Sequence, residues 1–111
     1  MFRTYTKEQA IEFLTECCEF LLKVMEKGDL PFEDADKDAI DHCISLLCVL
    51  MNDTDLELQS TKVVGALVNA QTIIQTIKIN SKIGPFIISH NRTNFEEAIL
   101  FVNDAINLLK Q

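Results

Sequence analysis

The feature that most constrains the fold is a charge-free stretch of fifteen residues, 63–77, which reads VVGALVNAQTIIQTI. Apolar residues recur in it at alternating steps of four and three, the spacing of one face of an α-helix. This face comprises Val63, Leu67, Ala70, Ile74 and Ile77. The opposite face carries small or polar residues without charge, namely Gly65, Asn69, Thr72 and Thr76. Because a helix so poor in charge is usually enclosed, we predict that it is the central helix, surrounded by its neighbours on most sides.

The first predicted helix spans about residues 7–27. It begins after a capping-box pattern, in which Thr6 is followed three residues later by Gln9. It stops at Gly28, because glycine is favourable just past the end of a helix. Its inward face is an apolar line with helical spacing, formed by Ile11, Leu14, Cys18, Leu21 and Met25. We expect this face to pack against the rest of the molecule.

The second predicted helix begins near Asp36 or Asp38 and ends near Asn52. Its core line has the same helical spacing and comprises Ile40, Cys43, Ile44, Leu47, Leu50 and Met51. After a turn, a further helical start near Asp55 precedes the charge-free helix, with a break expected near Ser60.

Residues 80–92 form the longest connection that the sequence predicts. Gly84 and Pro85 forbid a continuous helix there. One interpretation is a cap over the open end of a bundle, with one helical turn. The other is a binding loop in which Phe86 and Arg92 contact a partner, since apolar and basic residues lie together in it.

The last helix follows a second capping-box pattern, Thr93 with Glu96, and continues to the C-terminus. At 111 residues, with three glycines, two prolines and no internal repeat or linker, the chain fits one domain. The predicted fold class is therefore all-α, a single-domain antiparallel bundle of about four helices across residues 1–111, with a long loop before the last helix.

The charge of the chain is unevenly distributed. The net charge is −7, and fourteen of the seventeen acidic residues lie in residues 1–60. Nucleic acid is an unsuitable partner, because binding phosphates requires clustered Lys and Arg. No apolar run reaches the roughly 20 residues that cross a bilayer, so no membrane is expected either. A basic protein partner fits the charge.

Carboxylates follow the outer face of the first helix and then become denser. The helical stripe includes Glu12, Glu16 and Glu19. Between residues 29 and 41, six acids accompany a single lysine, Lys37, and these acids are Asp29, Glu33, Asp34, Asp36, Asp38 and Asp41. Capping and the helix dipole account for two or three acids at a helix start. The remainder oppose folding by mutual repulsion, so we assign both groups of acids to partner binding.

Chemistry-bearing motifs are missing from the sequence. Asp34, Asp36 and Asp38 have the spacing of the first calcium ligands, but Ala39 and Ser45 stand where that motif needs Gly and Glu. No phosphate loop, metal-ligand pair or nucleophile elbow occurs, and His42 reads as a surface residue. We expect no enzyme activity, no cofactor and no metal.

The four cysteines are expected to be buried, reduced thiols that act as small apolar side chains. They lie inside helical patterns at positions 17, 18, 43 and 48, and no signal peptide precedes them. The spacing of Cys43 and Cys48 is not a zinc spacing. These features predict a cytoplasmic protein.

In size, charge and helicity the chain resembles the small helical immunity proteins that neutralise bacterial toxins, many of them basic nucleases. It also resembles phage-encoded proteins that block host defence. The resemblance implies a non-enzymatic inhibitor of a basic protein partner, monomeric or homodimeric. The alternative is a structural or oligomerising helical module without an inhibitor role, which would associate through the apolar excess of the second helix around Leu46, Val49 and Met51.

Overall fold

The structure, a computed structural model, describes residues 5–52 and 60–111. Within these two ranges it contains four long α-helices, one short 3-10 helix and no β-strand. The elements are α1 (Lys7–Met25), α2 (Asp34–Met51), α3 (Thr61–Asn80), η1 (Ile88–Asn91) and α4 (Arg92–Lys110). The prediction of an all-α fold with about four helices is confirmed. The predicted helix start at Asp55 lies outside the described residues.

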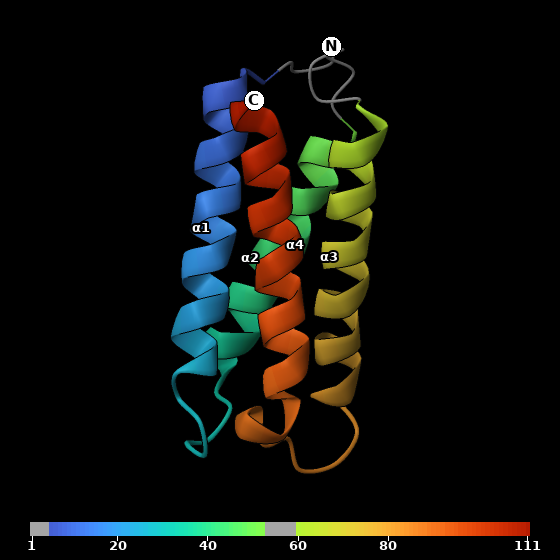
Figure 1. Cartoon of the computed structure of the whole chain (residues 1–111). Helices are drawn as coiled ribbons and strands as arrows, with labels where there is room; N and C mark the ends of the chain where they lie inside the picture. Colours follow the sequence, from blue (N-terminus) through green and yellow to red (C-terminus); the bar gives the residue numbers. More distant parts are fainter. Residues whose placement is uncertain (1–4, 53–59) are drawn as a thin grey trace.

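The four helices lie side by side as a ring in which each packs mainly on two neighbours (Figure 1). Helix α1 packs on α2 and α4, and α3 packs on the same two helices from the other side. The α1–α2 and α3–α4 connections lie at one end of the bundle, while the C-terminus lies at the other. Successive helices therefore run antiparallel, as expected for a bundle with short connections.

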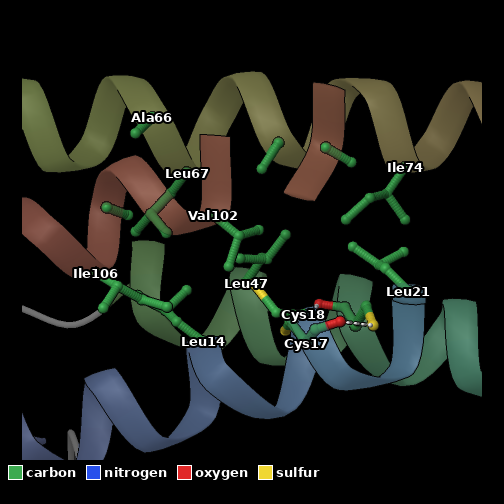
Figure 2. Close-up of a cluster of buried hydrophobic side chains, with 14 of the residues drawn as sticks. Leu14, Cys17, Cys18, Leu21, Leu47, Ala66, Leu67, Ile74, Val102 and Ile106 are labelled. Atoms are coloured by element: carbon green, nitrogen blue, oxygen red, sulfur yellow. Dashed lines mark hydrogen bonds between the residues drawn. The ribbon is translucent and has the colours of Figure 1, made fainter. Parts of the chain in front are cut away.

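The apolar line of the charge-free stretch is buried as predicted. Val63, Leu67, Ala70, Ile74 and Ile77 all lie in the hydrophobic core. They meet inward-facing side chains of the other three helices, including Leu14, Leu21, Leu47, Val102 and Ile106 (Figure 2). Burial of this kind stabilises a fold by roughly 1.5–3 kcal/mol for each large apolar side chain.

The predicted central position of α3 is wrong. Its opposite face lies in solvent: Gly65, Asn69, Thr72 and Thr76 are exposed, as are Val68 and Ile79. A helix in a ring of four has two neighbours and one free side, so low charge did not mean enclosure. The hydroxyls of Thr72 and Thr76 donate to the carbonyls of Val68 and Thr72, respectively, which satisfies these polar groups within the helix.

One helix start agrees with the sequence-based prediction, and two differ from it. The capping box of Thr6 and Gln9 is present at the start of α1. Helix α2 starts at Asp34, earlier than predicted. The capping box predicted at Thr93 is wrong, because η1 leads directly into a helix that already starts at Arg92.

The connection before α4 closes one end of the bundle, in agreement with the capping interpretation. Ile88 is fully buried, and the Ser89 N–H donates to the carbonyl of Gly28 at 3.1 Å. The rings of Phe32 and Phe86 contact each other with centroids 4.7 Å apart. Gly28 has a φ of +59°, a conformation that glycine adopts without strain as the chain leaves α1. The α1–α2 connection and the α3–α4 connection are therefore held together by this hydrogen bond and this ring contact.

Candidate functional site

The clearest concave acidic surface lies on the outer face of α1. Glu12, Thr15, Glu16 and Glu19 line a shallow depression of about 430 Å³. Residues three and four apart are neighbours on a helix surface, which explains why these side chains gather. The structure thus brings together the three α1 carboxylates that the sequence assigned to partner binding. We call this surface the acidic depression.

His42 of the neighbouring helix α2 contacts one residue of the acidic depression, Glu16. Its Nε2 lies 3.2 Å from Oε1 of Glu16, and its ring stands edge-on to Phe20 with centroids 5.3 Å apart. The sequence predicts His42 as a surface residue and indicates no partner for it. Glu16 and His42 are 26 positions apart, so only the packing of α1 on α2 reveals the contact.

The acidic depression is poorly neutralised by the protein itself. Among the described residues, no Lys or Arg forms an ion pair with Glu12, Glu16 or Glu19. Glu12 and Glu16 are one helical turn apart and repel each other, as like charges at this spacing do. An incoming cation would relieve this repulsion, so the arrangement favours a Lys or Arg side chain from outside.

Asp36 differs from the other acids because it has a structural role. It is 8% exposed, its Oδ2 lies 2.5 Å from Nζ of Lys27, and it accepts the Glu33 N–H at 2.9 Å. The assignment of Asp36 to partner binding therefore needs correction. Its carboxylate faces the end of α1 and closes the first turn of α2, where acids complement the helix dipole.

The other acids of residues 29–41 do not form one surface. Asp41 pairs with Lys78 at 2.7 Å on the side of α3, and Asp29 accepts the hydroxyl of Ser89 at 2.5 Å. Asp34 is almost fully exposed, with Lys37 3.8 Å away. Glu33 and Asp38 are also exposed. The dense acidic run in the sequence is therefore dispersed around the end of the bundle.

Phe86 and Arg92, the two candidates from the connection, make contacts within the chain. Phe86 is half-buried against Phe32, and Arg92 Nε donates to Oε1 of Glu96 at 2.6 Å. Exposed apolar residues nearby that sequence reasoning did not single out are Leu30, Ile83 and Ile87. Their exposure follows from the shape of the connections rather than from any periodic pattern.

The four cysteines are free thiols, and three of them are buried. The thiols of Cys17 and Cys43 each donate to the other's backbone carbonyl across the α1–α2 contact (Figure 2 shows part of this region). The hydrogen bond with Cys43 and then burial raise the pKa of Cys17 far above its ordinary range. Burial, followed by the nearby Cys43 and Glu19, raises the pKa of Cys18 to about 11. Both thiols stay protonated near neutral pH, which disfavours a nucleophilic role.

Residues 5–52 and 60–111 hold neither a metal-binding cluster nor a membrane-spanning helix. No group of three or more His, Cys, Asp or Glu side chains in these ranges is arranged to hold a metal ion. None of the helices described has the length and apolar character needed to cross a membrane.

Comparison with known proteins gives no assignment for this bundle. No protein-family model matches the chain, and no curated protein or solved structure is significantly similar to it.

Proposed function

We propose that this chain is a non-enzymatic, acidic, cytoplasmic binding protein that neutralises or inhibits a basic protein partner, as toxin-immunity and anti-defence inhibitors do. The observation that carries the proposal is the acidic depression, in which Glu12, Glu16 and Glu19 line one concavity. The bundle uses none of these three in an ion pair with Lys or Arg among the described residues. Glu16 contacts His42 at 3.2 Å, while Glu12 and Glu19 have no ion pair among the described residues, so an external cation would find carboxylates that the described bundle does not neutralise with Lys or Arg.

A basic partner would bind in two stages. The net charge of −7 first attracts it over distances of about a Debye length, which raises the association rate. A Lys or Arg side chain then enters the acidic depression, and an Arg guanidinium can bind two carboxylate oxygens at once. Phe20 and the half-exposed Leu22 lie on the same helix, and would supply apolar contact beside the charges.

Inhibition follows from what the basic surface of such a partner does. A nuclease-type toxin uses Lys and Arg to bind phosphates. When the acidic depression covers those side chains, it competes directly with the nucleic acid, so the inhibitor needs no chemistry of its own.

The test is a charge-neutral variant of the acidic depression, Glu12→Gln/Glu16→Gln/Glu19→Gln. The matched control is Glu96→Gln/Glu97→Gln/Asp104→Asn, which removes the same charge from three exposed acids of α4, outside the depression and away from the carboxylate stripe of α1. Wild type and both variants are used as baits in an extract of the native host. Retained proteins are quantified, and the basic protein lost from the depression variant is purified for association kinetics.

The proposal predicts that wild type and control retain the same basic protein and that the depression variant binds it with a slower on-rate. Wild-type association should also slow as salt increases. The proposal is wrong if wild type retains no basic protein, or if the depression variant retains every basic protein that wild type retains. It is also wrong if the two variants bind the partner equally.

Self-association is the second candidate, and the exposed side of α3 favours it. Between Gly65 and Ile79 the one charged residue is Lys78, near the end of the helix. The apolar side chains of Val68 and Ile79 are 45% and 57% exposed. The patch predicted on α2 is smaller than expected, since Leu46 and Met51 are partly buried. Light scattering separates the candidates, because a dimer disrupted by Val68→Lys supports self-association and a monomer at micromolar concentration contradicts it.

A further inference from the structure

A separate cavity of about 210 Å³ opens at the closed end of the bundle, between the start of α2 and the end of α3. Its lining combines three lysines with two apolar side chains, one acid and one serine: Lys37, Lys78, Lys82, Phe32, Ile40, Asp41 and Ser81. None of these residues belongs to the acidic depression, so an inference drawn from the cavity does not depend on the function proposed above.

The lysines exceed the acids that neutralise them. Lys78 pairs with Asp41 at 2.7 Å, while Lys37 has only the exposed Asp34 at 3.8 Å. Among the described residues, Lys82 forms no ion pair. The lining therefore holds three lysines and one acid, in a protein whose net charge is −7.

Helix dipoles explain only part of this lysine cluster. Lys78 and Lys82 lie at the C-terminal end of α3, where the dipole favours cations. Lys37 lies near the N-terminal end of α2, where the dipole disfavours a cation. The acids around Lys37, such as Asp34, offset this cost, so the feature to explain is that Lys37 lines one cavity with Lys78 and Lys82, and an anion held between the helices would use all three.

We propose that this cavity binds a small amphipathic anion, an aromatic ring or short acyl group that carries one phosphate or carboxylate. The apolar part would rest on Phe32 and Ile40, of which Ile40 is only 2% exposed. An apolar cavity of about 150 Å³ holds one benzene ring, so the available space suits a ring with its anionic group at the lysines.

Calorimetry and amide NMR test the site with defined probes. Phenyl phosphate carries both features, benzoate replaces the phosphate by a carboxylate, benzyl alcohol keeps the ring without charge, and inorganic phosphate keeps the charge without the ring. We expect saturable binding of phenyl phosphate with shifts at Phe32 and Ile40, weaker binding of benzoate, and no saturable binding of the other two. Saturable binding of benzyl alcohol with equal affinity would contradict the proposal, as would no saturable binding of any probe.

The variant Lys37→Gln/Lys82→Gln removes the two weakly paired lysines and keeps the Lys78–Asp41 pair. Its matched control is Lys23→Gln/Lys110→Gln, which makes the same change in net charge away from the cavity. Loss of charge-assisted contacts should raise the Kd for phenyl phosphate about tenfold or more in the first variant, and by less than about twofold in the control. Equal effects of the two variants would show that phenyl phosphate responds to overall charge and would overturn the site.

Discussion

Lys27 and Asp36 form an ion pair across the connection between α1 and α2, with Nζ of the lysine 2.5 Å from Oδ2 of the aspartate. The same carboxylate accepts the Glu33 N–H ahead of the first turn of α2. Both side chains of the pair are largely shielded from solvent, at 21% and 11% exposure. Asp36 thus fixes the end of one helix to the start of the next.

Asp36→Asn should therefore destabilise the fold, by about 1–3 kcal/mol in urea melts, because it leaves a shielded ammonium without its carboxylate. The control is Asp34→Asn/Asp38→Asn, which alters two exposed acids of the same helix and should leave stability nearly unchanged. Equal stability of both variants and wild type would show that the pair contributes nothing. A variant in which Asp34, Asp36 and Asp38 are all changed to Asn would combine the loss of the ion pair with the loss of two exposed charges, so it would not separate the two effects.

The core of α3 supports a second prediction. Leu67→Ala should cost roughly 2–5 kcal/mol, since this side chain is 2% exposed and its truncation leaves a cavity. Val68→Ala is the control, because its side chain is 45% exposed, and it should cost less than about 1 kcal/mol. If both variants lose the same small amount in urea melts, the face that α3 buries has been assigned wrongly.

The buried face of α3 could be read from sequence because the period of an α-helix is a local property. Val63 to Ile77 place their apolar side chains on one line whatever the helix packs against. The number of neighbours is not local. Thr72 and Thr76 satisfy their hydroxyls with carbonyls of their own helix, so they tolerate solvent or burial, and their lack of charge does not indicate enclosure.

The candidate site was predictable to a similar extent. Helical spacing gathered Glu12, Glu16 and Glu19 on one face, and the structure keeps them together. The partners of the remaining acids come from distant parts of the chain, as with Asp41 and Lys78 or Glu16 and His42. No local pattern shows which acids the fold itself uses.

Two glycines should respond to alanine in opposite directions. Gly65 is an exposed residue within α3 and has open space where a Cβ would lie, so Gly65→Ala should raise stability by about 0.5–1 kcal/mol. Gly28 also has open space but a φ of +59°, so Gly28→Ala should lower stability by about 1–2 kcal/mol. Thermal or urea melts of the two variants measure this, and a gain at position 28 would contradict the left-handed turn.

The buried thiols predict a loss of stability at alkaline pH. Folding raises the pKa of Cys17, mainly through its hydrogen bond with Cys43, and raises that of Cys18 from 9.0 to about 11, mainly through burial. A group whose pKa is higher in the folded state contributes stability below its unfolded pKa and loses it as pH rises toward the folded value. Stability should therefore fall between about pH 9 and pH 11.

Urea melts across this range measure the effect, with Cys17→Ala/Cys18→Ala as the control for other groups that titrate there. The double variant is less stable at neutral pH, since it leaves space in the core, but its stability should depend less steeply on alkaline pH. If the stability of the variant and that of the wild type depend equally on alkaline pH, ionisation of Cys17 and Cys18 does not cause the loss of stability.

The acidic depression should slightly weaken the fold of the free protein. Glu12 and Glu16, one turn apart on α1, repel each other by roughly 0.2–0.5 kcal/mol. In low salt, Glu12→Gln should therefore raise stability slightly, and this gain should shrink as added salt screens the charges. Glu16→Gln also removes the contact with His42, so its gain should be smaller. The comparison is made by urea melts at low and high salt.

A surface whose charges weaken its own fold is a candidate for an external use, since stabilising substitutions often cost function. The acidic depression fits this description if Glu12→Gln stabilises the free protein and also slows binding of the basic partner. A variant that loses stability in low salt would show instead that Glu12 contributes favourably to the bundle. The depression would then be part of the fold, and partner binding would have to be sought at the exposed apolar residues Leu30, Ile83 and Ile87.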